Sequence, residues 1–152
     1  MRRASSTLTT RSAQATRALG KSLAARLRGG DVVALRGDLG SGKTMLVQGI
    51  AAGLGVKRTV NSPTFILMRV YPVRPARRGI QQLVHVDGYR IHDEHEFEHI
   101  GLPDYLGRPD TVTVIEWPDR LPTLLPRRRW TVRLGTGAHL NHRRITVERT
   151  LA

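Results

Sequence analysis

Apolar residues recur along this chain with the periods of alternating helices and strands. Val32-Val33-Ala34-Leu35 is an unbroken apolar run, typical of a strand that is buried on both faces. Apolar residues at helical spacing follow over residues 46–54, and Gly53 and Gly55 mark the expected end of that helix. Upstream, an apolar stripe at i, i+4 spacing predicts a helix over residues 12–28. The chain is therefore expected to begin with a helix, a strand and a second helix.

Further segments favour strands in the rest of the chain. The last two segments, residues 130–134 and 144–148, alternate apolar and polar residues, so each is expected to have one solvent-exposed face. Gly135-Thr136-Gly137 between them favours an antiparallel pair. Residues 72–79, rich in Arg and Pro, are expected to form an exposed basic hairpin loop. The predicted strands are residues 65–71, 82–87, 112–116, 130–134 and 144–148.

A glycine-rich motif lies between the first strand and the helix that follows it. Gly37-Asp38-Leu39-Gly40-Ser41-Gly42-Lys43-Thr44 reads G-x-x-x-x-G-K-T, the phosphate-binding loop pattern. Glycines let the main chain wrap closely around an anion, and the loop N–H groups and the helix N-terminus direct positive charge at phosphates. Lys43 is placed to reach the β- and γ-phosphates, and the Thr44 hydroxyl is placed to ligate Mg²⁺. Together with Met45, these residues predict a nucleotide site; a glycine-rich turn without a ligand is the alternative.

This order of strand, loop and helix predicts the fold class. We expect an α/β, P-loop NTPase-like three-layer fold with a mostly parallel central sheet and a C-terminal antiparallel pair. With 152 residues the chain is expected to form one domain over residues 7–150, preceded by a disordered tail over residues 1–6. Residues 1–30 hold no acidic residue, which is also typical of an organellar transit peptide, but the helix predicted over 12–28 favours the structural interpretation.

Two predicted strands end in an acid. Asp87 ends the strand over 82–87 and Glu116 ends the strand over 112–116, where an α/β sheet places groups that hold Mg²⁺ or orient water. With Lys43, they are the candidate catalytic residues. One acid is expected to act on the metal and the other on the attacking water, and spacing does not decide between them. The loop Asn61-Ser62-Pro63-Thr64-Phe65 is either a γ-phosphate sensor or a plain turn.

A second motif points to different chemistry. His95-Glu96-Phe97-Glu98-His99 matches H-E-x-x-H, the zinc peptidase pattern, in which Glu96 would be the general base, and His92 lies nearby. The helical stretch is short, no sustained apolar face supports it, and a zinc peptidase has no use for a phosphate-binding loop. We therefore interpret this segment as an acidic, His-rich surface helix, although the sequence does not decide whether the three histidines bind a metal.

Net charge and the absence of cysteine limit the partners, sites and cellular locations to be expected for this chain. The net charge is +13, and 22 of the 25 basic residues are Arg, which indicates either a nucleic-acid partner or solvated basic faces of an Arg-rich protein. Aromatic residues are only 5%, too few for an interleaved base-stacking platform. The absence of Cys excludes disulfides, thiolate zinc sites and Cys nucleophiles, and no apolar run reaches the length of a membrane span. We expect a cytoplasmic protein without a membrane partner.

Four blocks in order resemble a known family. Gly37 to Thr44, Ser62-Pro63-Thr64-Phe65, His85-Val86-Asp87-Gly88-Tyr89-Arg90 and Ile115-Glu116-Trp117-Pro118 are similar to the TsaE-type (formerly YjeE) P-loop ATPases of bacteria, over about residues 7–148. The resemblance implies that the chain binds ATP and Mg²⁺, with Thr44 and Glu116 as metal ligands and Asp87 as the catalytic carboxylate. It also places Thr64 in a switch-like loop, Trp117 beside the nucleotide, Thr10 to Ala13 near the adenine, and Arg144 near the phosphates. Met45 and Gly88 depart from the family pattern.

The function that the resemblance implies is support of threonylcarbamoyladenosine formation on tRNA. The chain would be an Mg²⁺-dependent ATP-binding subunit that hydrolyses ATP slowly and acts with TsaB and TsaD homologues. The sequence does not decide whether the chain contacts tRNA directly or only indirectly. Two alternatives stay open from the residues alone. One is a small-molecule kinase, and the other is a nucleotide-gated assembly subunit with little catalytic role.

Overall fold

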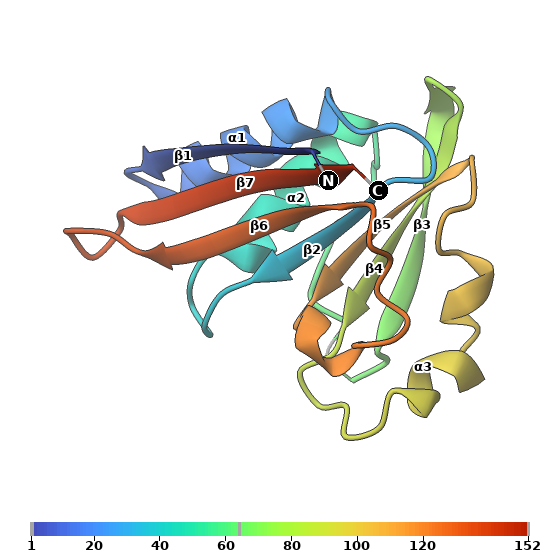
Figure 1. Cartoon of the computed structure of the whole chain (residues 1–152). Coiled ribbons are helices and arrows are strands. Elements are labelled where there is room, and N and C mark those ends of the chain that lie inside the picture. The colour runs from blue at the N-terminus through green and yellow to red at the C-terminus, as the bar shows by residue number, and fades with distance from the viewer. Residues whose placement is uncertain (1, 64, 152) are drawn as a thin grey trace.

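The computed structural model describes residues 2–63 and 65–151, and its elements alternate along the chain much as the apolar pattern predicts (Figure 1). The strands are β1 (Arg2–Thr10), β2 (Val32–Arg36), β3 (Met68–Arg77), β4 (Ile80–Asp87), β5 (Thr111–Glu116), β6 (Arg129–Thr136) and β7 (Arg143–Leu151). The α-helices are α1 (Ala13–Ala24), α2 (Lys43–Leu54) and α3 (His95–His99), and two 3₁₀ turns are η1 (Leu102–Asp104) and η2 (Pro118–Arg120).

All seven of these strands form one mixed sheet in the order β1-β7-β6-β2-β5-β4-β3. The four inner strands β6, β2, β5 and β4 run parallel, whereas β1, β7 and β3 pair antiparallel with their neighbours. The predicted C-terminal antiparallel pair is confirmed as β6 and β7. The expected mostly parallel sheet holds only for the inner four strands, because three of the six pairings are antiparallel.

The chain start is a strand, and the expected disordered tail over residues 1–6 is wrong from residue 2 onward. β1 pairs with β7 over its full length, from Arg2 opposite Leu151 to Thr10 opposite Arg143. Its Ser, Thr and Arg composition resembles a flexible tail, but Leu8 is its single large apolar side chain and an edge strand needs little more. Pairing with β7, at the far end of the chain, therefore orders β1, whose own sequence does not indicate a strand.

Strand β3 is longer than the predicted strand over 65–71, and the expected loop over 72–79 is wrong. Tyr71 and Val73 are both buried, so the alternation of the strand continues past Pro72. The pairing with β4 shifts register between Pro72 and Arg77, and the turn itself is only Arg78-Gly79. Proline is tolerated there because β3 is an edge strand and its N–H groups need not enter a ladder.

Helices α1 and α2 pack closely against each other and cover one face of the sheet. Ser12 caps α1, and its hydroxyl accepts a hydrogen bond from the Ala15 N–H at 3.0 Å. A Cβ placed on Gly49 would lie 1.9 Å from the Arg17 carbonyl oxygen, and one on Gly20 would lie 2.3 Å from that of Leu46. These two glycines therefore let the helix backbones touch, and the main hydrophobic cluster forms beneath them with strands β2 to β7.

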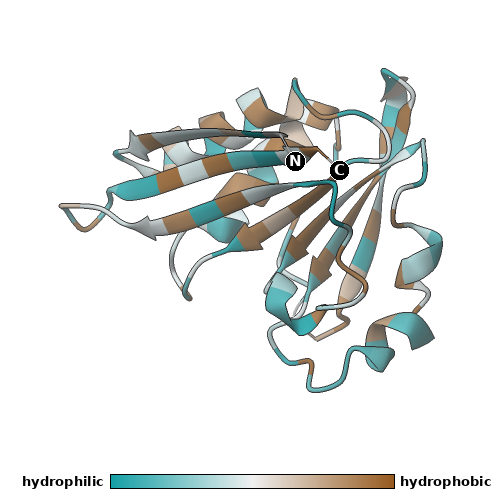
Figure 2. Ribbon diagram, viewed as in Figure 1, coloured by the Kyte–Doolittle hydropathy of each residue, from teal (hydrophilic) through white to brown (hydrophobic). Residues whose placement is uncertain are grey.

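The other face of the sheet is covered over only part of its width. A second cluster joins Val32, Val84, Val86 and Ile115 of the inner strands to Phe97 of α3 and to Leu102 and Leu121. Beyond it, the same face of β1, β7 and β6 carries polar residues and has no helix packed on it among the described residues. Hydrophilic and hydrophobic residues alternate along β6 and β7, as expected for strands with one polar face (Figure 2). The sheet thus has helices on both faces near β4 and β5 and on one face near β1.

Candidate functional site

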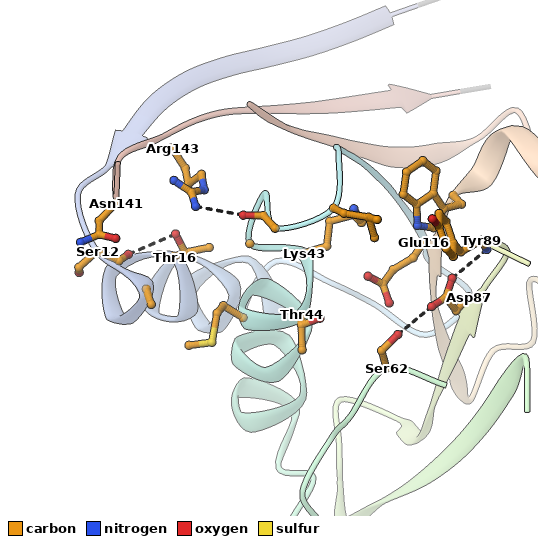
Figure 3. Close-up of a pocket in the computed structure, with 16 residues that line it drawn as sticks. Ser12, Thr16, Lys43, Thr44, Ser62, Asp87, Tyr89, Glu116, Asn141 and Arg143 are labelled. Carbon is orange, nitrogen blue, oxygen red and sulfur yellow. Dashed lines mark hydrogen bonds between the residues drawn. The ribbon is translucent and has the colours of Figure 1, made fainter. Parts of the chain in front are cut away.

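A cavity of about 470 Å³ opens where β2, β4 and β5 end, within the size range of small-molecule sites (Figure 3). It is bordered by the glycine loop and the start of α2 on one side and by the ends of β4 and β5 on the other. The α1 start and the β6–β7 hairpin close its far end. The lining residues are Ser12, Ala13, Thr16, Leu39, Gly40, Gly42, Lys43, Thr44, Met45, Ser62, Asp87, Tyr89, Glu116, Trp117, Asn141 and Arg143.

The glycine loop holds Lys43 at the base of this cavity. Gly42 has φ 100°, a left-handed conformation that glycine adopts without strain, and it lets α2 begin directly at Lys43. The Lys43 Nζ donates to the carbonyl oxygen of Gly37 and, at 3.0 Å, to that of Asp38. It also lies 4.6 Å from the centre of the Trp117 ring. Gly37 and Asp38 therefore orient Lys43 and do not line the cavity themselves.

Burial affects the charge of this lysine. Lys43 is only 6% exposed, and loss of hydration lowers the pKa of its ammonium, while the carboxylates of Glu116, Asp87 and Asp38 oppose that shift. A buried cation that faces acids on one side and a helix N-terminus on the other is suited to bind an anion, because the anion would replace the lost water.

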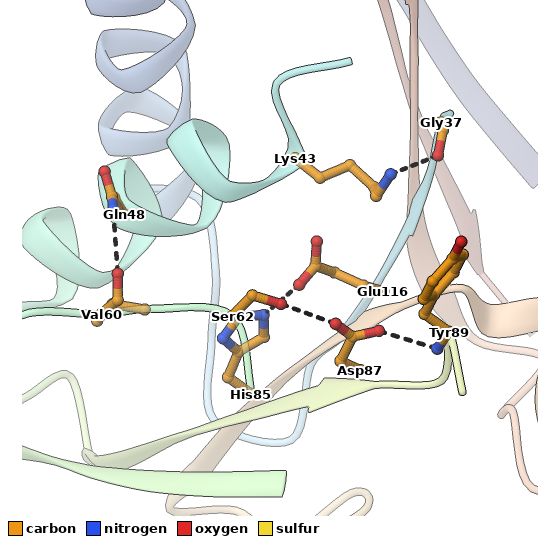
Figure 4. A network of polar contacts seen from close by, with 9 residues as sticks. All are labelled: Gly37, Lys43, Gln48, Val60, Ser62, His85, Asp87, Tyr89 and Glu116. Carbon is orange, nitrogen blue, oxygen red and sulfur yellow. Dashed lines mark hydrogen bonds and ion pairs between the residues drawn. The ribbon is translucent and has the colours of Figure 1, made fainter. Parts of the chain in front are cut away.

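Asp87 and Glu116 lie side by side, because they are partners in the parallel pairing of β4 and β5. Their side chains are held by different groups (Figure 4). The Ser62 hydroxyl donates to Asp87 Oδ2 at 2.7 Å, and the Tyr89 N–H donates to Asp87 Oδ1 at 2.9 Å. Glu116 Oε2 lies 2.8 Å from His85 Nε2. Both acids are buried, so their orientations are fixed before any ligand arrives.

His85 has a structural role that the sequence interpretation missed. It lies two residues before Asp87 on β4, so both side chains point to the same side of the sheet. Its side chain is fully buried, and its Nδ1 has no hydrogen-bond partner among the described residues. The H-x-D spacing before Gly88 was the available signal, since a polar residue within an otherwise apolar buried strand needs a partner.

Arg143, and not Arg144, reaches the cavity, so the sequence prediction was one residue off. Successive residues on a strand point to opposite faces, and Arg143 lies on the side of buried Ile145 and Val147. Its guanidinium donates to the carbonyl oxygens of Ser41 and Gly40, both at 3.0 Å. It therefore braces the backbone of the glycine loop, whereas Arg144 is exposed on the opposite face.

The two residues predicted to approach the adenine differ in where they lie. Ala13 lines the cavity, with Ser12 and Thr16 beside it, but Thr10 does not. Thr10 is buried behind Thr16, and the two hydroxyl oxygens are 2.7 Å apart. Thr10 thus supports the wall and leaves the surface of the cavity to residues from the first turn of α1.

Most other predicted residues line the cavity as expected, and a few are displaced from it. Leu39, Gly40, Gly42, Lys43, Thr44, Met45, Asp87, Glu116 and Trp117 all line it. Ser41 belongs to the loop but points its buried hydroxyl inward, where it has no partner among the described residues. Thr64 lies outside the described residues. Ser12, Thr16, Ser62, Tyr89, Asn141 and Arg143 line the cavity without having been predicted as site residues.

The H-E-x-x-H segment forms a five-residue helix, α3, away from the cavity. His95 Nδ1 lies 3.1 Å from Glu98 Oε2 on the exposed side of this helix, and that hydrogen bond raises the pKa of the His95 ring. No group of three His, Cys, Asp or Glu residues within 2–63 and 65–151 is placed to hold a metal ion. In the same ranges, none of the helices has the length and apolar character needed to span a bilayer.

Comparisons with known proteins agree with this arrangement. The family model described as "Threonylcarbamoyl adenosine biosynthesis protein TsaE" matches residues 10–145. Proteins named tRNA threonylcarbamoyladenosine biosynthesis protein TsaE are similar in sequence. That of Mycobacterium tuberculosis is 40% identical over 132 residues, covering 84% of this chain and 77% of the relative. That of Treponema pallidum is 39% identical over 137 residues, covering 90% and 96%.

A solved structure is similar over almost the whole chain. The crystal structure of YdiB from Bacillus subtilis superposes with a TM-score of 0.78 at 30% identity, and the match covers 99% of this chain and 89% of that one. Sequence and structure thus agree over the region that contains the glycine loop, the paired acids and Arg143. The chain therefore belongs to the TsaE family of threonylcarbamoyl adenosine biosynthesis proteins.

Proposed function

We propose that this protein binds ATP with Mg²⁺ in the described cavity, hydrolyses it slowly, and thereby supports threonylcarbamoyladenosine formation on tRNA together with TsaB and TsaD homologues. The observation that carries the proposal is that Lys43, Thr44, Asp87 and Glu116 all line one cavity at the start of α2. Phosphoryl transfer needs a cation, a metal-binding hydroxyl and strand-end carboxylates in one place, and this arrangement supplies all of them.

The fit to a triphosphate follows from the donors at the loop. The α2 N-terminus directs the positive end of a twelve-residue helix into the cavity. Gly40 has φ 78°, and a Cβ added there would meet no described atom within 4 Å, so its backbone borders open space. The Lys43 ammonium, which now bonds to Gly37 and Asp38, would turn to the β- and γ-phosphates and regain the solvation that burial removes.

The donor set also fits Mg²⁺, which prefers hard oxygen ligands. The Thr44 hydroxyl and the Glu116 carboxylate would hold the ion. His85 contacts Oε2 of Glu116, so Oε1 would be the oxygen left for the ion. When bound, the ion would neutralise charge on the β- and γ-phosphate oxygens.

Asp87 is then the residue that orients the attacking water. Its oxygens accept hydrogen bonds from the Ser62 hydroxyl and from the Tyr89 N–H, which fix the orientation of the carboxylate at the cavity. Its fixed orientation beside the phosphate end of the cavity is the kind of positioning that lowers the barrier to hydrolysis.

Slow turnover by the isolated chain follows from its arginines. Among the described lining residues the one arginine is Arg143, and the loop carbonyls already hold its guanidinium. An arginine that stabilises the transition-state charge contributes about 10³–10⁵-fold in related phosphoryl transfers. A chain without a free one is expected to be slow until a partner supplies or orders the missing group.

Calorimetry with ATP tests this function directly. We expect Mg²⁺-dependent binding that Lys43→Ala abolishes, and recovery of the TsaB and TsaD homologues from a lysate only when nucleotide is present. Lys57→Ala serves as the matched control, because Lys57 is exposed and lies outside the cavity. Unchanged ATP affinity in Lys43→Ala, or absence of Mg²⁺-dependent heat in the native chain, would refute the proposal.

A second function, nucleotide-gated assembly with little role for hydrolysis, is favoured by the cavity rim. Leu39 and Tyr89 line the cavity and are 68% and 40% exposed, and Leu140, three residues before Arg143 in the β6–β7 hairpin, is 89% exposed. Exposed apolar groups around a site mark a contact surface. If nucleotide-gated assembly is the function, Asp87→Ala would still recover the partners when ATP is present. If ATP hydrolysis is required, the same variant would fail to support tRNA modification.

A further inference from the structure

The uncovered face of β1, β7 and β6 carries arginines at regular positions. Strand pairing places Arg3, Thr150 and Arg129 in one row across the sheet, and Thr7, Thr146 and Arg133 in another. Arg36 of β2 continues the second row as the partner of Arg133. Arg144 lies two residues further along β7 on the same face, so the arginines extend over about 20 Å of strand.

The positive charge of this face is only partly neutralised. Glu148 lies 3.7 Å from Arg3 and 3.6 Å from Arg133, and Asp119 pairs with Arg36. Five arginines therefore share two carboxylates. Burial lowers the pKa of Arg129, and the nearby charges of Arg36, Arg133 and Arg3 lower it further, while the Glu148 carboxylate opposes the shift.

Two donors in the cluster have no acceptor. The Nε of Arg36 and the Nε of Arg129 have no hydrogen-bond partner among the described residues. Both Nε atoms are buried, so an external ligand would meet the terminal nitrogens of these side chains, of which Arg129 Nη1 donates to the Pro126 carbonyl oxygen and Arg36 Nη1 to Asp119. An under-neutralised cluster of this kind is stabilised when an external polyanion approaches it.

We propose that this face, made of Arg3, Arg36, Arg129, Arg133 and Arg144, binds the sugar–phosphate backbone of RNA. The choice of RNA rests on the proposed role in tRNA modification, and the chemistry of the face agrees with it. Guanidinium groups match phosphate geometry, and the Ser and Thr hydroxyls of β1 and β7 donate to phosphate or accept from the ribose 2′-OH.

The composition of the same face does not favour sequence-specific recognition of RNA bases. Its residues on β1, β7 and β6 are Arg, Ser, Thr, Glu and Gly, with no aromatic ring on which a base could stack. Backbone contacts position an RNA but carry no sequence information. Binding is therefore expected to depend strongly on salt and weakly on sequence, and to follow the shape of a folded RNA.

The face and the cavity lie on opposite sides of the sheet. Arg143 and Arg144 are neighbours on β7, yet Arg143 contacts the glycine loop (Figure 3), whereas Arg144 belongs to the basic face. RNA on one side therefore leaves the nucleotide cavity accessible on the other, and the two sites can be tested separately.

The test is fluorescence anisotropy with an unmodified tRNA transcript and the full chain, titrated over a range of salt concentrations. The variant Arg3→Ala/Arg133→Ala/Arg144→Ala removes three exposed arginines from the face, and Arg58→Ala/Arg69→Ala/Arg74→Ala removes three exposed arginines elsewhere. Both variants carry the same net charge. We expect the face variant to bind at least tenfold more weakly. Each phosphate contact contributes about 0.7–0.9 to the slope of log affinity against log salt, so loss of three arginines is expected to lower that slope by about 2. The control is expected to stay within about threefold.

Equal losses in the two variants, or no binding by the native chain near 150 mM salt, would overturn the proposal. Displacement of the RNA by polyglutamate at equal charge would also overturn it, because that result indicates attraction to any polyanion. Lys43→Ala separates this inference from the proposed function, since it is expected to lose ATP and keep RNA. An RNA-binding chain that fails to bind ATP would refute the nucleotide proposal alone.

Discussion

Replacing Arg143 by alanine would remove the side chain that connects the β6–β7 hairpin to the glycine loop. The guanidinium donates to the carbonyl oxygens of Gly40 and Ser41 at 3.0 Å each, and it also donates to those of Leu140 and His142 at 2.7 and 2.8 Å. The first two bonds hold the backbone of Gly40 and Ser41 in place at the cavity. Their loss would let the loop sample conformations that do not bind phosphate.

The magnitude follows from the two loop bonds. Arg143 is half-buried, so each bond is partly screened, and a net contribution of about 1 kcal/mol per bond is appropriate. The loss of about 2 kcal/mol corresponds to about 30-fold weaker ATP binding, because 1.4 kcal/mol is tenfold. The same variant is expected to lower thermal stability modestly, since the hairpin loses its contact with the loop.

Arg144→Ala is the matched control, because the two arginines are adjacent and carry the same charge. Isothermal titration calorimetry with MgATP would compare both variants with the native chain, and thermal unfolding would show that both are folded. Equal ATP affinities for Arg143→Ala and the native chain would refute the bracing role. A loss in Arg144→Ala as large as in Arg143→Ala would show that long-range charge, and not loop geometry, determines the affinity.

Three further predictions follow from the packing of the site. Gly49→Ala would place a methyl group 1.9 Å from a backbone carbonyl of α1 and lower the free energy of unfolding by at least about 1 kcal/mol, seen in urea melts, whereas Gly135→Ala, whose nearest contact would be 3.8 Å, would have little effect. His85→Phe would leave the β5 carboxylate without its partner and weaken the Mg²⁺ dependence of ATP binding by about 10–100-fold, while metal-free binding measured by calorimetry would persist. Trp117→Phe would abolish the change in tryptophan fluorescence on ATP binding, and Trp130→Phe, which lies outside the cavity, would retain it.

The phosphate end of the site, the glycine-loop end where we propose that the phosphates bind, could be predicted from sequence because its backbone permits few residue types. A left-handed turn at Gly42, a lysine that reaches back to Gly37, and strand-end acids each leave a fixed pattern in the chain. Parallel pairing of β4 with β5 then brings Asp87 beside Glu116, as the shared strand-end position indicates. The residue types of the loop and the order of the strands were therefore sufficient to predict the glycine-loop end of the cavity.

The far end of the cavity could not be predicted in the same way, because long-range pairing builds it. Thr10 of β1 and Arg143 of β7 are strand partners from opposite ends of the chain, and no local sequence pattern predicts that register. A shift of one residue reverses the face of every side chain on a strand, which is why Arg144 was expected in the place of Arg143. The same missing information made residues 1–6 resemble a disordered tail.

This division has a physical consequence for how the site forms. The phosphate end depends on contacts between segments close to the parallel core, whereas the far end requires β1 to close on β7 after nearly the whole chain is present. β1 is an edge strand, paired along one side only, and Thr10 at its end holds Thr16 in the cavity wall. Removal of β1 would therefore expose the edge of β7 and release that wall while leaving Lys43, Asp87 and Glu116 in place. The far end is thus the part of the cavity whose order depends on the chain terminus, and affinity for the nucleoside is expected to depend on that strand more than affinity for the phosphates does.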